Sequence, residues 1–120
     1  MKVNSYKFRE SCEVVNKLCH TTMNRIISCM NKHHNHCELL GEYLKACIVM
    51  EKLCNYCCTT CCNTENGISK YILKEVNEKC NKIILCCGKI NKVKMPKKDI
   101  KEIRCDKLMV VCNKLIKMCK

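Results

Sequence analysis

The sequence predicts an all-α protein: an antiparallel up-down four-helix bundle with a cysteine-lined core, formed by residues 1–120 as a single domain. Three observations predict this fold. Cysteines recur at heptad spacing together with leucines, which is typical of a helix core stripe. Polar segments divide the chain into four stretches. Three glycines and one proline are too few for a turn-rich disulfide knot and suit long helices.

The first two helices are predicted at 5–32 and 36–63, on either side of the polar segment NKHHN. Asn35 and Glu38 resemble a capping pair at the start of the second helix. Both helices carry an apolar and sulfur-containing stripe at spacings of three and four. The stripes consist of Phe8, Cys12, Val15, Cys19, Met23, Ile26 and Met30 in the first helix, and of Cys37, Leu40, Leu44, Cys47, Glu51, Cys54, Cys58 and Cys61 in the second.

The third and fourth helices are predicted at 67–91 and 97–119. Asn66 can cap the third helix, Gly88 can end it early, and Pro96 suits the first turn of the fourth. Twelve of the sixteen cysteines lie on the four stripes, and Cys29, Cys57, Cys62 and Cys86 lie off them. The last two stripes consist of Leu73, Val76, Cys80, Ile83 or Ile84 and Cys87, and of Cys105, Leu108, Cys112, Leu115 and Cys119.

Core thiols at this density have three interpretations. Cysteine can pack as a small hydrophobe, but twelve of them would leave a core poorly filled compared with leucine. Disulfides are the second interpretation. Cysteines seven apart on one helix are separated by about 10.5 Å along the axis, too far for a bridge, so disulfides could form only between helices. A structural or interaction protein stapled by inter-helix disulfides therefore stays an alternative.

Metal binding is the third interpretation. Tetrahedral zinc sites use paired CxxC segments, whereas Cys54/Cys57 and Cys58/Cys61 lie on one helix with no second pair elsewhere. Iron–sulfur clusters use compact cysteine runs in loops. Cu(I) fits better, because it is soft, selects thiolate and thioether ligands, and accepts two or three sulfurs. Residues four apart share a helix face, so Cys54/Cys58 can supply two converging thiolates to one ion.

The candidate ligands for several Cu(I) ions per chain are the stripe cysteines with nearby thioethers and imidazoles. Cysteine–methionine and histidine–cysteine pairs recur at four-residue spacing, and the stretch HHNHC and Met95 fall at one end of the predicted bundle, where we expect metal to enter. Equal heptad steps also predict a central layer of Cys19, Cys54, Cys80 and Cys112. The full candidate set is Cys12, Cys19, Cys37, Cys47, Cys54, Cys58, Cys61, Cys80, Cys87, Cys105, Cys112, Cys119, Met23, Met109, His33 and His36.

Other classes of function have weak support in the sequence. The formal net charge of +12 is typical of a lysine-coated helical surface, and the chain has few aromatic residues and no nucleic-acid-binding motif. It has no nucleophile elbow, phosphate loop or paired carboxylates, so we expect no enzyme. The start MKVNSYKFRES has no apolar signal region, and no apolar stretch approaches the roughly 20 residues of a membrane span. We expect a cytoplasmic protein with reduced thiols.

The cysteine pattern resembles that of the four-helix-bundle copper-storage proteins, in their cytosolic branch. The likeness is carried by CIVMEKLCNYCC, with Cys47, Cys54 and Cys58, by CDKLMVVCNKLIKMC at the end of the chain, and by the histidine-rich HHNHC. The resemblance implies storage or buffering of several Cu(I) ions along the bundle, without catalysis, in exchange with a copper donor or acceptor. The chain departs from the family where leucine, isoleucine, valine or methionine replaces an expected cysteine, which implies a lower capacity. These positions are Val15, Met23, Ile26, Met30, Leu40, Leu44, Val76, Leu108 and Leu115.

Overall fold

The computed structural model describes residues 5–32, 36–59 and 68–120, and the regular structure within these ranges is entirely helical. The predicted all-α class is therefore confirmed for the described part of the chain. Its five helices are α1 (Ser5–Lys32), α2 (Cys37–Thr59), α3 (Lys70–Ile90), α4 (Lys97–Ile103) and α5 (Asp106–Cys119).

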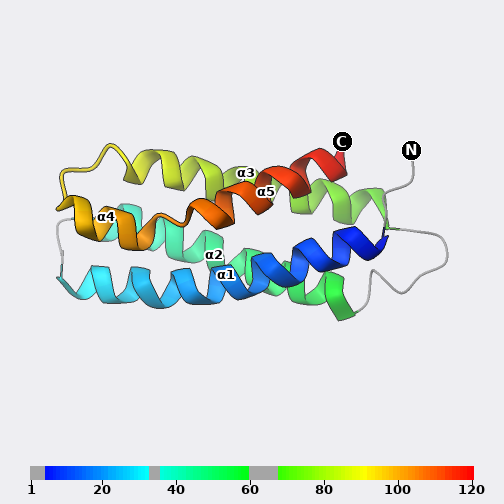
Figure 1. The fold of residues 1–120 in the computed structure, drawn as a ribbon, viewed down its shortest axis with the longest axis horizontal. Helices are drawn as coiled ribbons and strands as arrows, with labels where there is room; N and C mark the ends of the chain where they lie inside the picture. Colours follow the sequence, from blue (N-terminus) through cyan, green and yellow to red (C-terminus); the bar gives the residue numbers. More distant parts are fainter. Residues whose placement is uncertain (1–4, 33–35, 60–67) are drawn as a thin grey trace.

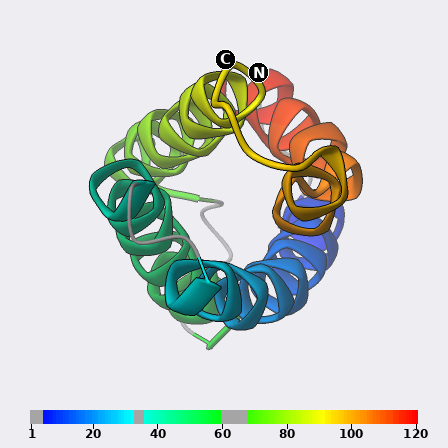
Figure 2. The same cartoon turned by 90° about the vertical axis from the view of Figure 1, so that its left-hand side faces the viewer.

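The helices pack side by side into a rod of 48 × 22 × 19 Å (Figure 1). Viewed along the rod, they surround one core, with α1 beside α2, α2 beside α3, α3 beside α5, and α4 and α5 beside α1 (Figure 2). One end of the rod holds the connection between α3 and α4, and we call it the α3–α4 end. The other holds the last turn of α5, and we call it the C-terminal end.

The helix boundaries agree with the sequence prediction in α1 and differ in α3. The third helix begins at Lys70, later than predicted, because Ser69 provides the cap: its hydroxyl accepts a hydrogen bond from the Tyr71 amide at 3.2 Å. It then continues through Gly88 to Ile90, so this glycine does not end it early. The predicted caps Asn35 and Asn66 lie outside the described residues.

The single helix predicted over 97–119 is wrong, because α4 and α5 are separate helices. Arg104 and Cys105 between them have extended backbones, with φ, ψ of −81°, 113° and −102°, 100°. The break leaves the Ile103 carbonyl without a helical partner, and the buried hydroxyl of Tyr43 donates a hydrogen bond to it at 3.0 Å. Arg104 donates to Asp106 and to the Asn91 side chain, at 2.9 and 3.0 Å. The two helices still follow one another along the same side of the rod (Figure 1).

Most members of the predicted stripes are buried or pack against the core. The α2 stripe is partly wrong, because Leu44, Glu51 and Cys58 are only half-buried. The residue before each of them is the buried one: Tyr43, Met50 and Cys57.

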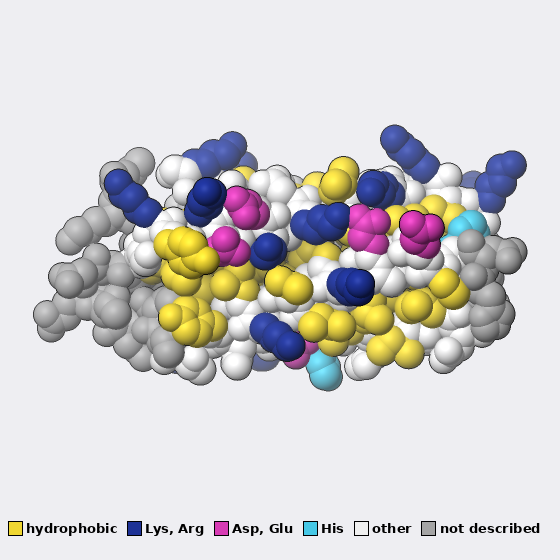
Figure 3. All heavy atoms as spheres, turned by 180° about the vertical axis from the view of Figure 1, so that it is seen from behind, with side chains coloured by type: hydrophobic (Ala, Val, Ile, Leu, Met, Phe, Trp, Pro, Cys, Tyr) yellow, Lys and Arg dark blue, Asp and Glu magenta, His cyan; other side chains and the backbone are white. Residues whose placement is uncertain are grey.

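Cys112 is fully buried and Lys114 is exposed, as the heptad pattern requires. Large aliphatic and aromatic side chains fill the space between the thiols, including Phe8, Tyr43 and Leu115. Lysine and arginine side chains spread over the face seen in Figure 3, with apolar groups between them.

None of the five described helices combines the length and the apolar character that crossing a membrane requires.

Candidate metal centre

Thiols line the core on every side of the rod. Among the described residues, fourteen cysteines are unbonded; ten of them are buried and four are half-buried. The buried ones are Cys12, Cys19, Cys29, Cys47, Cys54, Cys57, Cys80, Cys86, Cys87 and Cys112, and the half-buried ones are Cys37, Cys58, Cys105 and Cys119.

Thiols of α1 meet thiols of α2 across the interface between these helices. Cys12 is hydrogen-bonded to Cys54 and to Cys57. One heptad further along α1, Cys19 is hydrogen-bonded to Cys47. The two contacts follow the antiparallel register, because a step of seven residues forward in α1 is matched by a step of seven residues back in α2.

A third pair of thiols connects α3 and α5, on the opposite side of the rod. Cys80 of α3 is hydrogen-bonded to Cys112 of α5, so these two thiols share a level as the heptad argument predicts. The α1–α2 register differs from that argument, which set Cys19 beside Cys54. Cys19 pairs with Cys47, so α2 is displaced by one heptad relative to the predicted layer, although α1 ends and α2 begins close to the predicted positions.

The four members of the predicted central layer, Cys19, Cys54, Cys80 and Cys112, are all fully buried in the core. Hydrogen bonding to Cys47 and burial raise the pKa of Cys19, and electrostatic interaction with Cys54 and Cys112 adds to the rise. Hydrogen bonding to Cys12 lowers the pKa of Cys54, whereas burial and electrostatic interaction with Cys80 and Cys112 raise it. The four thiols therefore lie close enough to interact electrostatically. We call the part of the core that holds this layer and the three thiol contacts the thiol-paired half.

Two thiols of this half, Cys19 and Cys80, are weaker acids than an ordinary cysteine. Hydrogen bonding to Cys47, followed by burial, raises the pKa of Cys19, and hydrogen bonding to Cys112, followed by burial, raises the pKa of Cys80. At neutral pH these groups are protonated. Metal binding here must release protons, since the ligand is the thiolate.

The core toward the α3–α4 end is organised around Tyr43, and we call it the tyrosine half. Cys87 donates a hydrogen bond to the Tyr43 hydroxyl at 3.5 Å. Burial, followed by electrostatic interaction with Cys87, Cys47 and Cys105, raises the pKa of Tyr43. The phenol therefore stays protonated, and it donates a hydrogen bond to the Ile103 carbonyl.

The predicted thioether and imidazole ligands occupy the margins of the core. Met23 and Met109 are half-buried and pack against it. Cys58, also half-buried, donates to the Arg9 carbonyl at 3.8 Å. His36 lies at the α3–α4 end with Nε2 3.3 Å from the Lys94 carbonyl oxygen. The remaining candidates, His33 and Cys61, lie outside the described residues.

Three cysteines that the stripes omit are buried: Cys29, Cys57 and Cys86. Each follows a stripe residue by three positions, so a stripe wider than the heptad seam would have included them. Cys57 belongs to the thiol-paired half through Cys12. Cys29 lies in the tyrosine half, where its thiol is 4.0 Å from the sulfur of Met95.

Cross-helix pairs are thus the main arrangement of thiols in this core. Within the described ranges, no group of three or more cysteine, histidine, aspartate or glutamate side chains is arranged to hold a metal ion. A pair of thiols can do either of two things chemically. It can bind one soft ion between two thiolates, or it can be oxidised to a disulfide.

Comparison of the chain with known protein families, with curated proteins and with solved structures finds no match. The likeness to the copper-storage proteins rests on the cysteine rhythm of the sequence.

Proposed function

We propose that this chain is a single-domain Cu(I)-binding protein that stores or buffers several ions through thiolates in its core. We further propose that it is a variant of the four-helix bundle, in which α4 and α5 together take the place of the fourth helix. It works without catalysis, in the cytoplasm, and exchanges copper with a donor or acceptor.

The observation that carries this proposal is the pairing of buried thiols across helices. Cys80 with Cys112, and Cys19 with Cys47, each present two fully buried sulfurs from different helices. Two sulfurs satisfy Cu(I), whereas a tetrahedral zinc site needs four ligands. Several such pairs in one core would give a store with several sites.

Anaerobic titration of the reduced protein with Cu(I), in competition with a strong Cu(I) chelator, tests the proposal. We expect several ions per chain, release of protons on binding, and preference for Cu(I) over Zn(II). A stoichiometry of one or below would refute storage.

The same thiol pairs support a second candidate, a structural or interaction protein stapled by disulfides between helices. Its lysine-rich surface would bind an acidic partner. Alkylation of the protein under denaturing, non-reducing conditions, followed by mass spectrometry, separates the two candidates. Modification of nearly all sixteen cysteines supports the copper store, and intact bridges at the pairs support the scaffold.

A further inference from the structure

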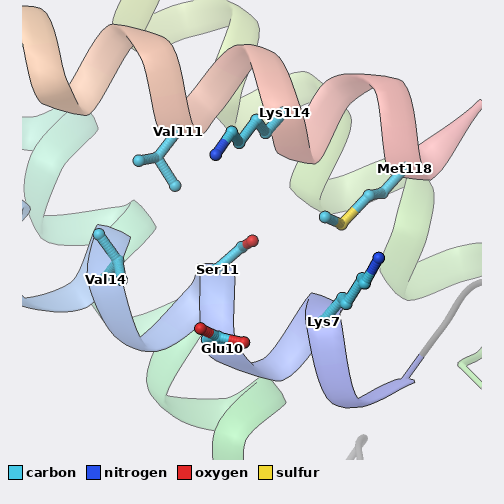
Figure 4. A pocket seen from close by; sticks show the side chains of 7 residues that line it. All are labelled: Lys7, Glu10, Ser11, Val14, Val111, Lys114 and Met118. Atoms are coloured by element: carbon cyan, nitrogen blue, oxygen red, sulfur yellow. The ribbon is translucent and has the colours of Figure 1, made fainter.

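A groove lies between α1 and α5 toward the C-terminal end of the rod (Figure 4). Its volume of about 420 Å³ is in the range of pockets that hold small molecules. Four residues of α1 and three of α5 line it: Lys7, Glu10, Ser11 and Val14, and Val111, Lys114 and Met118.

The groove combines positive charge with a soft ligand. Figure 4 shows the ammonium groups of Lys7 and Lys114, from opposite walls, turned toward the space between the helices. The hydroxyl of Ser11 and the sulfur of Met118 are turned toward the same space. Glu10 is the one acidic side chain in the lining. Such walls suit a small anion that has carboxylates for the lysines and a soft atom for the thioether.

The groove is adjacent to the thiol-paired half. Ser11 directly precedes the buried Cys12, and Met118 directly precedes the half-buried Cys119. Cys12 is part of the buried core, and Cys119 packs against that core. In each of the two helices, a core thiol therefore directly follows a residue that lines the groove.

We propose that this groove docks an anionic Cu(I) complex of a small carboxylate-bearing thiol, of the glutathione kind, and that copper passes from it to Cys119. The inference rests on the proposed copper binding and adds the carrier and the place of entry. The two lysines hold the carboxylates of the carrier, and Met118 offers an exchangeable ligand to the ion.

The transfer is a ligand exchange without oxidation or reduction. The bond between Cu(I) and one carrier sulfur breaks as a bond to the sulfur of Cys119 forms. The thiol proton of Cys119 goes to the departing carrier thiolate, so charge is conserved. Further exchanges carry the ion toward Cys57 and Cys12.

The sequence led us to expect entry at the α3–α4 end, where Cys29 meets a thioether, that of Met95. The groove lies at the opposite, C-terminal end of the rod, and the experiments below distinguish the two ends.

Stopped-flow loading of the reduced protein at low ionic strength tests the inference. The probe is the Cu(I)–glutathione complex, and the groove variant is Lys7→Glu with Lys114→Glu. The matched control, Lys94→Glu with Lys98→Glu, changes the net charge equally at exposed lysines of the α3–α4 end.

We expect the groove variant to load about tenfold more slowly and the control to load as the parent does, because steering depends on local charge. Loading from the cationic acetonitrile complex of Cu(I) should not be slowed by the groove substitutions.

A second measurement locates the first ion directly. After addition of less than one equivalent of Cu(I)–glutathione, alkylation and mass spectrometry should find Cys119 and Cys12 protected before Cys29. Protection of Cys29 first, or equal slowing by the control variant, would overturn the inference while the protein still fills from a chelator. A parent protein that takes up no copper from any source refutes the proposed function and the inference together. Circular dichroism of each variant checks that the helices are retained.

Discussion

The two halves of the core carry the same cysteine rhythm and present different chemistry. In the thiol-paired half, the register sets Cys19 against Cys47 and Cys80 against Cys112. In the tyrosine half, Cys87 meets the phenol of Tyr43. A heptad cysteine is therefore a candidate ligand only where the facing helix brings another sulfur to its level. The spacing of cysteines within one helix does not decide which of them can bind a metal ion.

The largest expected difference between the halves is in copper capacity. Replacing one member of each contact, in the variant C12A/C19A/C80A, should remove the greater part of the Cu(I) bound at saturation. Cys47 and Cys112 are then each left without their partner thiol, and Cys54 and Cys57 lose the thiol of the facing helix. The matched variant C29A/C86A/C87A removes the same number of buried thiols outside the pairs and should retain more copper. Anaerobic chelator competition measures both. Equal losses would contradict a division of the core by pairing.

The tyrosine half should depend on Tyr43 for its stability. Tyr43→Ala should lower the free energy of unfolding of the apoprotein by about 3–5 kcal/mol, since it empties a fully buried aromatic site. Tyr43→Phe keeps the ring and should cost about 1–3 kcal/mol, because the Ile103 carbonyl loses its donor. Urea denaturation measures both values. Tyr71→Phe, at a side chain that is 69% exposed, is the control and should change stability by less than about 0.5 kcal/mol.

Alkaline pH should weaken the fold of the apoprotein, and Cys87 and Cys119 should be two of the thiols that contribute to this loss. The pKa values of Cys87 and Cys119 are both raised to about 11 from an ordinary 9.0, mainly by burial. A thiol with a raised folded pKa stabilises the fold fully below pH 9.0, and this contribution is lost as the pH rises through about 11. We therefore expect the urea midpoint to fall over that interval. C87A and C119A should each make the fall shallower, and a midpoint that rises with pH would contradict both assignments.

The smallest expected effect comes from two glycines inside helices of the tyrosine half. A Cβ at Gly41 or at Gly88 would meet no atom within 4 Å. Gly41→Ala and Gly88→Ala should therefore each stabilise the apoprotein by up to about 1 kcal/mol, through helix propensity and a less flexible unfolded chain. Thermal unfolding followed by circular dichroism measures the gain. Copper capacity should stay the same, because neither position is a sulfur site.

Much of the fold follows from local sequence patterns. The heptad stripes predicted the all-α class and the buried faces, including Cys12, Cys80 and Cys112. The break at Arg104 was not predictable in this way, because neither glycine nor proline occurs there. The carbonyl of Ile103, just before the break, accepts a hydrogen bond from the Tyr43 hydroxyl, 60 residues away in sequence.

The candidate site was predictable in its chemistry and less so in its geometry. The choice of thiols came from their density and their place on the stripes, but pairing depends on register. Register between α3 and α5 followed the prediction at Cys80 and Cys112, whereas between α1 and α2 it shifted by one heptad. Register depends on how side chains of two facing helices pack together, which the pattern of one helix alone does not contain.

The heptad step between the pairs at Cys12/Cys54 and Cys19/Cys47 has a consequence for occupancy. Two thiolates with one Cu(I) carry a net charge of −1, and successive sites of this kind are about 10.5 Å apart along the helices. At an effective dielectric constant of about 20, their repulsion is roughly 1.6 kcal/mol, about a tenfold weakening of the second affinity. Filling is then negatively cooperative: each ion binds more weakly than the last. A row of chemically similar sites would respond over a wider span of free copper concentrations than a single site.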